Sequence, residues 1–338
     1  MDIQLTEKET QQILGKKDVI PPLYYKFGDY KYNTECKARI LSGIPDLDYM
    51  IKGFELGCIT IWTGMTNSGK TTMLTKIANQ SIAQGERVFY FNGEQTKDDF
   101  KNNLYRQSTT KQHIIQKQYK DSCVFDYFVD EQERIRLDKI YGNTLFVYNN
   151  NAPRTIDFLL QAMEEIRQRE KIKVYILDNF MQIETTSSDE YREQKEIAEK
   201  LRTFAVNKNV HIHLVVHSKK PEKFQNRLTL YDVFGSSNIV NKAYNVISIM
   251  RVDTMNKDTP EYERLKQDML KEDYDIEETG TVLEILKTKG VRCGLVGLVY
   301  DTDTKNFNPQ LKLYKSSFIP QKRYIPEEDD ESQMELPF

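Results

Sequence analysis

The residues best suited to chemistry lie in a glycine-rich stretch at positions 64–71, which reads GMTNSGKT. It fits the pattern G-x-x-x-x-G-K-[ST], in which backbone N–H groups, a lysine and a hydroxyl surround phosphate oxygens. In such a loop the lysine reaches the β- and γ-phosphates and the hydroxyl coordinates Mg²⁺. The stretch therefore predicts binding of ATP or another NTP together with Mg²⁺. The predicted nucleotide-binding residues are Gly64, Asn67, Ser68, Gly69, Lys70, Thr71 and Thr72.

The flanking sequence supplies the strand and the helix that this loop requires. Residues 58–62 form a short apolar, β-rich run, and residues 72–83 carry apolar side chains at helical spacing. A turn between a strand and a helix N-terminus aims backbone N–H groups at one point, where an anion is stabilised. This context makes a chance match in an ordinary turn the weaker alternative.

Three further polar residues follow apolar strand-like runs. Asp178 would hold Mg²⁺ opposite Thr71, and Glu94 would act as the base that orients the attacking water. Their structural alternatives are a strand-end turn cap and a helix N-terminal carboxylate. His217 is either a sensor of the γ-phosphate or a structural histidine at a strand end.

Composition limits the classes of protein that remain. The 338 residues are 39% hydrophobic and carry a net charge of −3, so a nucleic-acid surface must be local. The four cysteines are scattered, which argues against a zinc ribbon and a disulfide framework. The sequence shows no membrane-length apolar run and no signal peptide, so we expect a cytoplasmic protein without a membrane partner.

The chain divides into three parts. Residues 1–40 form an N-terminal segment, either a linker ordered by packing or a helix that docks on a neighbouring subunit. Residues 41–317 alternate strand-like and helix-like runs, which predicts an α/β fold: a mostly parallel sheet flanked by helices, with an antiparallel edge hairpin. Residues 318–338 form an acidic tail.

Within the core, the predicted strands are 59–63, 88–91, 145–148, 174–177, 212–216 and 246–250, with an edge hairpin of 282–286 and 295–300. The predicted helices are 72–83, 97–107, 155–170 and 190–207. The charged stretch 108–143 is expected to be an insertion, helical in part, and 254–279 a solvated excursion.

A locally basic loop follows His217. Between His217 and Lys242 five basic residues stand against two acidic ones, and small residues occur at Gly235 and Ser236. Such a loop suits close approach to a sugar-phosphate backbone, although charge alone favours a solvated surface. The candidate DNA-binding residues are Lys219, Lys220, Lys223, Arg227, Gly235 and Ser236.

The ordered set of motifs resembles the ring-forming replicative DNA helicases, most closely the Twinkle and phage helicase–primase type and more distantly DnaB. The set comprises the loop at 64–71, Glu94, ILDNF at 176–180, VVHSKK at 215–220 and VFGSS at 233–237. The resemblance covers about residues 38–310, including SGIPDLD at 42–48. It implies a RecA-like P-loop NTPase core and a homohexameric ring around single-stranded DNA. The chain departs from the helicase–primase pattern in that no zinc-binding or primase domain precedes the core, so we do not expect priming to reside in this chain.

The resemblance also assigns roles to single residues. It implies Lys70 and Thr71 on phosphate and Mg²⁺, Asp178 as the second metal group, Glu94 as base and His217 as switch, with the loop after His217 lining the DNA channel. Tyr300 matches an aromatic residue that stacks on the nucleotide base, with a core tyrosine as the alternative.

In this family a cation from the neighbouring subunit completes the catalytic site. It follows the strand that here reads LEILKTKG at 283–290. Lys289 stands where an arginine is usual, and lysine lacks the bidentate fork of arginine. Either Lys289 serves, or Arg292 reaches in, or the coupling between subunits is weaker.

The C-terminus combines an acidic run at 327–331 with a short apolar end. Acidic residues keep such a segment extended and solvated. Gln333, Leu336 and Phe338 form Q-x-x-L-x-F, which resembles peptides that dock on the sliding clamp. An acidic run ending in phenylalanine also resembles tails by which phage helicases hold DNA polymerase. A solubilising tail without a partner is the third possibility.

The sequence thus predicts an NTP hydrolase that acts as a replicative helicase, translocating on single-stranded DNA as a hexameric ring in the bacterial or phage-infected host cytoplasm. A RecA-like recombinase or regulatory ATPase would share this core without unwinding. A nucleotide-binding adaptor without hydrolysis is a third class.

Overall fold

The computed structural model describes residues 26–29, 35–185, 189–218, 227–233 and 237–312. The chain forms two units, residues 1–37 and 38–338. In the first unit the described element is a 3₁₀ turn, η1 (Phe27–Asp29). The second unit contains the other described elements. No helix in the described ranges is long and apolar enough to cross a membrane.

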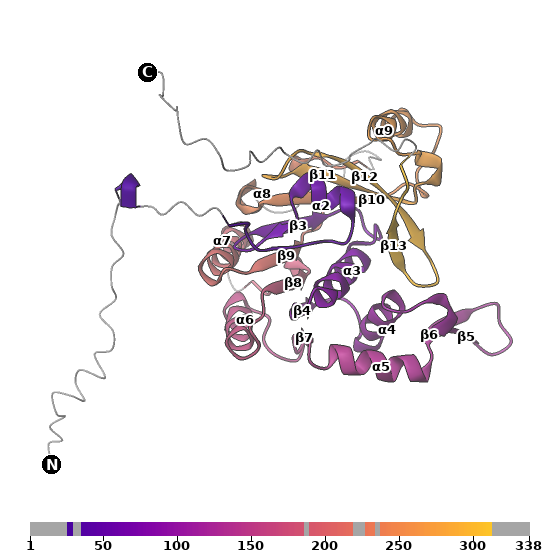
Figure 1. Ribbon diagram of the computed structural model, residues 1–338, viewed down its shortest axis with the longest axis horizontal. Helices are drawn as coiled ribbons and strands as arrows, with labels where there is room; N and C mark the ends of the chain where they lie inside the picture. Colours follow the sequence, from indigo (N-terminus) through magenta and orange to yellow (C-terminus); the bar gives the residue numbers. More distant parts are fainter. Residues whose placement is uncertain (1–25, 30–34, 186–188, 219–226, 234–236, 313–338) are drawn as a thin grey trace, which may run out of the picture. The chain divides into compact units, whose positions relative to one another are not determined.

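A nine-stranded sheet forms the centre of the second unit, in the order β13-β12-β11-β10-β3-β9-β8-β4-β7 (Figure 1). The pairs from β10 to β7 are all parallel, whereas β11, β12 and β13 extend the sheet antiparallel from β10. The α/β fold with a mostly parallel sheet is therefore confirmed. The strand bounds are β3 (Ile59–Thr63), β4 (Val88–Asn92), β7 (Leu145–Val147), β8 (Val174–Asp178), β9 (His211–Val215), β10 (Asn245–Arg251), β11 (Thr281–Lys287), β12 (Gly294–Asp301) and β13 (Asn306–Pro309).

The central strands are buried on both faces, as their nearly continuous apolar sequences require. Every residue of β3, β4, β8 and β9 is buried. Successive side chains point to opposite faces, so Ile61 joins one hydrophobic cluster and its neighbour Trp62 the other. Two cores therefore hold the sheet rigid from both sides.

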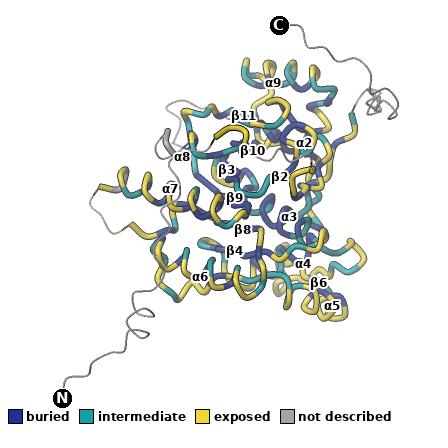
Figure 2. The backbone as a smooth tube through the Cα atoms, turned by 60° about the vertical axis from the view of Figure 1, so that its left-hand side comes forward, coloured by how far each residue is buried: buried dark blue, intermediate teal, exposed yellow. Residues whose placement is uncertain are grey.

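Helices cover both faces of this sheet (Figures 1 and 2). The cluster on one face includes buried residues of α2 (Pro45–Ile51), α3 (Lys70–Ala83), α4 (Lys97–Gln107) and α9 (Pro260–Lys271). The cluster on the other face includes residues of α6 (Ile156–Glu170), α7 (Glu190–Lys208) and α8 (Ser237–Lys242). Figure 2 shows exposed, yellow residues on the outer sides of α6, α7 and α9, as expected for amphipathic helices, whereas α3 is mostly buried or half-buried.

The sequence prediction did not include α2, α8 or β13, and two longer stretches also differ from it. The insertion contains a helix, α5 (Glu131–Tyr141), but also an antiparallel hairpin, β5 (Ile114–Gln118) with β6 (Phe125–Val129). The predicted solvated excursion contains α9, whose Tyr262, Leu265 and Met269 are buried. The remaining short elements are β1 (Arg39–Ile40), β2 (Phe54–Glu55) and four 3₁₀ turns: η2 (Lys111–His113), η3 (Phe180–Gln182), η4 (Leu230–Asp232) and η5 (Ile276–Glu278).

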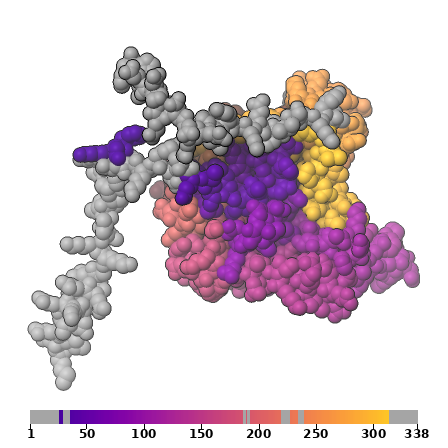
Figure 3. All heavy atoms as spheres, in the orientation of Figure 1, coloured from indigo at the N-terminus to yellow at the C-terminus, as the bar shows by residue number. Residues whose placement is uncertain are grey.

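The start of the insertion lies against the last strands of the sheet. Arg106, near the end of α4, donates hydrogen bonds to the carbonyl oxygens of Thr302 (2.7 Å) and Asp303 (2.6 and 2.8 Å). Lys111 forms an ion pair with Asp301 at 3.2 Å. In the space-filling view the magenta surface of the insertion accordingly adjoins the yellow surface of the C-terminal strands (Figure 3). These contacts connect the insertion to the turn between β12 and β13.

Candidate active site

The loop between β3 and α3 has the backbone shape of a phosphate-binding loop. Asn67 and Gly69 adopt left-handed conformations, with φ of 62° and 94°, and Gly64 has φ of 152°. A Cβ on Gly64 would lie 2.4 Å from the carbonyl oxygen of Ile249, so only glycine fits there. Helix α3 begins at Lys70, with Gly69 as its N-cap. The free N–H groups of its first turn therefore adjoin the loop.

Lys70 lies inside the loop that precedes it. Its Nζ donates hydrogen bonds to the carbonyl oxygens of Gly64 (3.0 Å) and Met65 (2.8 Å). Burial lowers the pKa of Lys70, while the Asp178 and Glu94 carboxylates oppose that effect. The side chain is thus a partly desolvated cation beside two acids, which suits it to bind phosphate oxygens.

Asp178 ends β8 and is 1% exposed. Burial raises the pKa of Asp178 to about 6, although a hydrogen bond with the Thr71 side chain favours the charged form. A buried carboxylate beside a hydroxyl offers the hard oxygen ligands that Mg²⁺ prefers. A bound cation would also relieve the cost of the buried charge. Asp178 and Thr71 therefore fit a Mg²⁺ site.

Glu94, Asn179 and His217 form a cluster beside Asp178. They follow β4, β8 and β9, which are neighbours in the sheet. The Asn179 side-chain Nδ2 donates to Glu94 Oε1 and lies 2.9 Å from His217 Nε2. His217 Nε2 is 3.4 Å from the same glutamate oxygen. The sequence analysis did not predict Asn179 as a site residue. Its position directly after Asp178, at the end of a strand, was the signal that could have identified it.

One cavity of about 330 Å³ joins these groups. It brings together most of the predicted nucleotide-binding residues with both acids and the histidine. Val215, the first residue of the VVHSKK motif, and Gln95 line it too, although neither was predicted as a site residue. Its walls are Thr66, Asn67, Gly69, Lys70, Thr71, Thr72, Glu94, Gln95, Asp178, Val215 and His217.

An aromatic pair flanks the loop. A Cβ added to Gly69 would lie 2.9 Å from Phe307 Cζ, so that ring packs directly on the loop. The Phe307 ring lies 5.2 Å from that of Tyr300, measured between centroids. Tyr300 is 37% exposed and does not line the cavity itself. The pair is therefore a candidate surface for a nucleotide base, with Phe307 nearer the loop than the predicted Tyr300.

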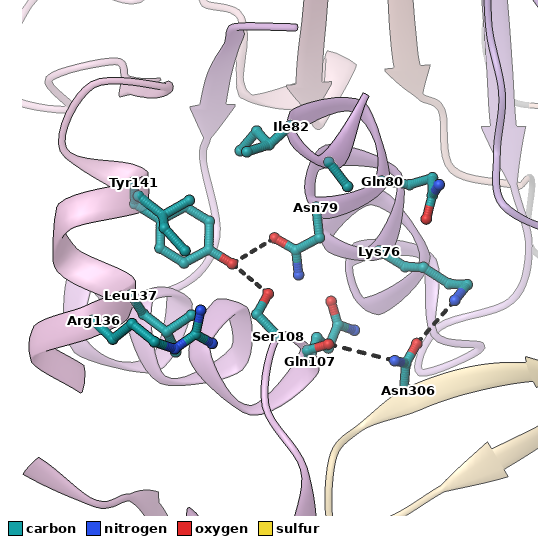
Figure 4. Close-up of a pocket in the computed structure, with 12 residues that line it drawn as sticks. Lys76, Asn79, Gln80, Ile82, Gln107, Ser108, Arg136, Leu137, Tyr141 and Asn306 are labelled. Atoms are coloured by element: carbon teal, nitrogen blue, oxygen red, sulfur yellow. Dashed lines mark hydrogen bonds between the residues drawn. The ribbon is translucent and has the colours of Figure 1, made fainter. Parts of the chain in front are cut away.

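A second cavity, of about 370 Å³, lies along α3 and extends to α5 and β13 (Figure 4). Gln107 Nε2 donates to the carbonyl oxygens of Thr72 (2.9 Å) and Lys305 (2.8 Å). Lys76 Nζ donates to Asn306 Oδ1 at 3.1 Å, a contact drawn in Figure 4. These bonds fix the first turns of α3 against the β12–β13 turn and so support the loop.

The two candidate trans-acting cations have different surroundings. Both guanidinium NH groups of Arg292 donate to Glu272, at 2.5 and 2.6 Å. Lys289 Nζ instead lies 5.7 Å from the centre of the Tyr244 ring. The neighbouring Lys287 donates to the carbonyl oxygens of Val240 (2.7 Å) and Asn241 (3.3 Å). Of the two predicted cations, Lys289 is therefore the one without a carboxylate partner among the ion pairs of the described residues.

Most of the predicted DNA-binding residues, namely Lys219, Lys220, Lys223, Gly235 and Ser236, lie outside the described residues. Arg227 is described, and its guanidinium is bound by Glu284 (2.9–3.1 Å) and Asp268 (2.7 Å). These contacts anchor it to β11 and α9, so the prediction that Arg227 contacts DNA has no support in the structure. Gln333, Leu336 and Phe338 of the tail also lie outside the described residues.

Fold and site together define a class of protein, the P-loop NTPases with a RecA-like core. A model of the DnaB-like helicase C-terminal domain matches residues 40–309. The chain therefore belongs to the DnaB-like helicase family, whose members are ATP-dependent replicative DNA helicases and typically form hexameric rings.

Solved structures are similar in fold. The ATPase domain of one DnaB-like replicative helicase gives a TM-score of 0.64 at 15% identity, over 81% of this chain and 92% of that one. A second DnaB-like replicative helicase, studied with its interactions with primase, gives the same TM-score and identity over 80% of this chain and 63% of that one. The circadian clock oscillator protein KaiC of Rippkaea orientalis is 36% identical over 69 residues, 20% of this chain and 13% of KaiC.

Proposed function

We propose that this chain hydrolyses ATP, or another NTP, with Mg²⁺ to drive a hexameric replicative helicase along single-stranded DNA. The observation that carries the proposal is the meeting of Lys70, Thr71, Asp178 and Glu94 in one cavity. This cavity lies where the parallel strands end, the usual ligand position in such sheets. Family membership supports single-stranded DNA as the track and the cytoplasm of a bacterium or infected host as the compartment.

Each residue has a distinct part in hydrolysis. The α3 N–H groups and Lys70 would bind the β- and γ-phosphates, and Thr71 and Asp178 would hold Mg²⁺, which when bound would neutralise charge on the phosphate oxygens. Glu94 orients the attacking water and accepts its proton. Glu94 lies two residues after the buried strand β4, so the sheet brings it to the same edge as the loop.

DNA is proposed to contact the loop after His217 through Lys219, Lys220, Lys223, Gly235 and Ser236. The described residues at its two sides support this placement. Ser218 and Val233 form an antiparallel bridge, so the chain that carries Lys219, Lys220 and Lys223 begins and ends beside the catalytic cluster, and Gly235 and Ser236 come shortly after Val233. A basic loop anchored there would transmit DNA contact to the nucleotide.

The test is NTP hydrolysis with and without single-stranded DNA. We expect DNA to stimulate the wild type, and Lys70→Ala or Glu94→Gln to abolish turnover while both variants keep the wild-type circular dichroism spectrum. Loss of a catalytic group costs at least about 100-fold. Normal hydrolysis in either variant would defeat the assignment.

A RecA-like recombinase or regulatory ATPase is the alternative, because it shares this core. Hydrolysis indifferent to DNA, or open filaments instead of closed rings in electron micrographs of the nucleotide-bound protein, would favour it.

We also propose that the tail recruits a replication partner, a sliding clamp or a DNA polymerase, through Gln333, Leu336 and Phe338. The proposal rests on the acidic run followed by an apolar end. A peptide of residues 325–338 is expected to bind one of the two, and Phe338→Ala to abolish that binding. If the peptide binds neither, the tail is a solubilising segment.

A further inference from the structure

Asn179 lies between the proposed base and the histidine, because β8 lies between β4 and β9 in the sheet. The residue is 1% exposed. A buried amide has no access to water, so its hydrogen-bonding groups must find partners within the protein. The hydrogen-bond partners of the Asn179 side chain therefore show which groups it positions.

The contacts fix the orientation of the amide. Asn179 Oδ1 accepts a hydrogen bond from the Met181 N–H at 2.8 Å. The Nδ2 group, with two hydrogens, must then face Glu94 and His217. It donates to Glu94 Oε1 and to His217 Nε2, the latter at 2.9 Å. The Nδ2 group of one amide thus bridges the base and the histidine, while Oδ1 holds the amide to the backbone.

The histidine connects this bridge to the proposed DNA loop. Ser218 follows His217 directly and pairs with Val233 across the base of the loop. Ser218 Oγ also lies 3.7 Å from the sulfur of Met65, whose carbonyl accepts from Lys70. A displacement of the chain at Ser218 would therefore reach both sides of the nucleotide site.

We propose that Asn179 is a positioning residue that restrains Glu94 until the chain at His217 moves, so that hydrolysis responds to DNA. The inference rests on the proposed function, since it takes Glu94 as the base and the following loop as the DNA contact. A glutamate oxygen engaged by an amide is less available to an attacking water. The hydrogen bonds to Glu94 and His217 share the Nδ2 group of Asn179. A shift of His217 would therefore move the amide and weaken its hydrogen bond to the Glu94 carboxylate.

The experiment measures ATP hydrolysis by the full chain with and without single-stranded DNA. Asn179→Ala removes both arms of the bridge. We expect it to raise DNA-independent hydrolysis by about tenfold, the effect of one hydrogen bond to a charged group, and to reduce the stimulation by DNA by a similar factor. Binding of a fluorescent ATP analogue and the melting temperature check that the variant is folded and binds nucleotide.

Asn150→Ala is the matched control. Asn150 Nδ2 donates to the carbonyl oxygen of Asn92 at the end of β4, at 2.6 Å, so this variant also loses an amide hydrogen bond at the same sheet edge. It does not touch the base, and we expect the wild-type ratio of stimulated to basal hydrolysis.

The outcomes separate the inference from the proposed function. If the wild type is stimulated by DNA and Asn179→Ala keeps the same ratio, the inference is overturned and the helicase assignment stands. Equal losses with and without DNA in a folded Asn179→Ala variant would also overturn it, because the residue would then only support the site. A wild type without any stimulation would overturn the proposed function itself.

Discussion

Two histidines of β9 have pKa values below the ordinary value because they are buried. His211 and His213 are fully buried, and their rings lie 4.6 Å apart. Burial lowers the pKa of His211 to about 4 and that of His213 well below its ordinary value. Trp62 Nε1 lies 3.2 Å from His213 Nδ1, to which it donates a hydrogen bond. Both rings are therefore held neutral, as structural residues of the sheet.

These shifts predict acid sensitivity. Below the ordinary histidine pKa of about 6.5, the unfolded chain binds protons on His211 and His213, whereas the folded chain does not. The neutral histidines therefore cost no stability above that pH, and the free energy of unfolding decreases as the pH falls below it. Asp178 opposes this, because its raised pKa lets the folded chain take up a proton below about pH 6. Together, these three groups lower the free energy of unfolding by about 2 kcal/mol between pH 7.5 and pH 5.5.

Urea unfolding at the two pH values measures the total change in stability, to which these three groups contribute. In His213→Gln, whose amide oxygen can still accept from Trp62, the loss should be about 1 kcal/mol smaller because one titrating group is gone. An unchanged loss in this variant would contradict the assignment of His213 as a buried neutral ring.

At the scale of elements, strands buried on both faces were predictable from sequence. The prediction for β3 is correct at both ends, β8 is one residue longer at its end, and β10 is one residue longer at each end. Such strands are uninterrupted apolar runs, and their carboxyl ends share one edge. The sequence therefore predicted that Lys70, Asp178 and Glu94 lie at one edge of the sheet, and all three line the same cavity.

The elements that the sequence did not reveal owe their form to tertiary contacts. The β5–β6 hairpin has mostly exposed or half-exposed residues, so no alternating apolar pattern marked it. Helix α9 carries only three buried residues in a charged sequence, and they matter because they pack on the sheet. Asn179 and Phe307 reach the site through neighbours distant in sequence, which local spacing cannot show.

At the scale of the whole molecule, Lys70 is the one lysine or arginine among the described residues that line the cavity, and a ring would supply a second cation for the transition state from the next subunit. Arg292 is held by Glu272 in its own chain, whereas Lys289 lies over Tyr244. We therefore propose Lys289 as the trans-acting cation, in a position where the family has arginine.

The proposal predicts that Lys289→Ala reduces DNA-stimulated hydrolysis by at least about 100-fold, because a trans cation is worth that much or more. Arg292→Ala, the matched control, should stay within about twofold of wild type.

Mixing two kinds of variant subunit in one ring then shows whether Lys289 acts on the neighbouring subunit's site or on its own. Lys289→Ala subunits keep an intact base, and Glu94→Gln subunits keep an intact lysine. Rings co-assembled from these two inactive variants should regain hydrolysis at junctions where each supplies what the other lacks. If the mixed rings remain as inactive as either parent, Lys289 acts within its own chain.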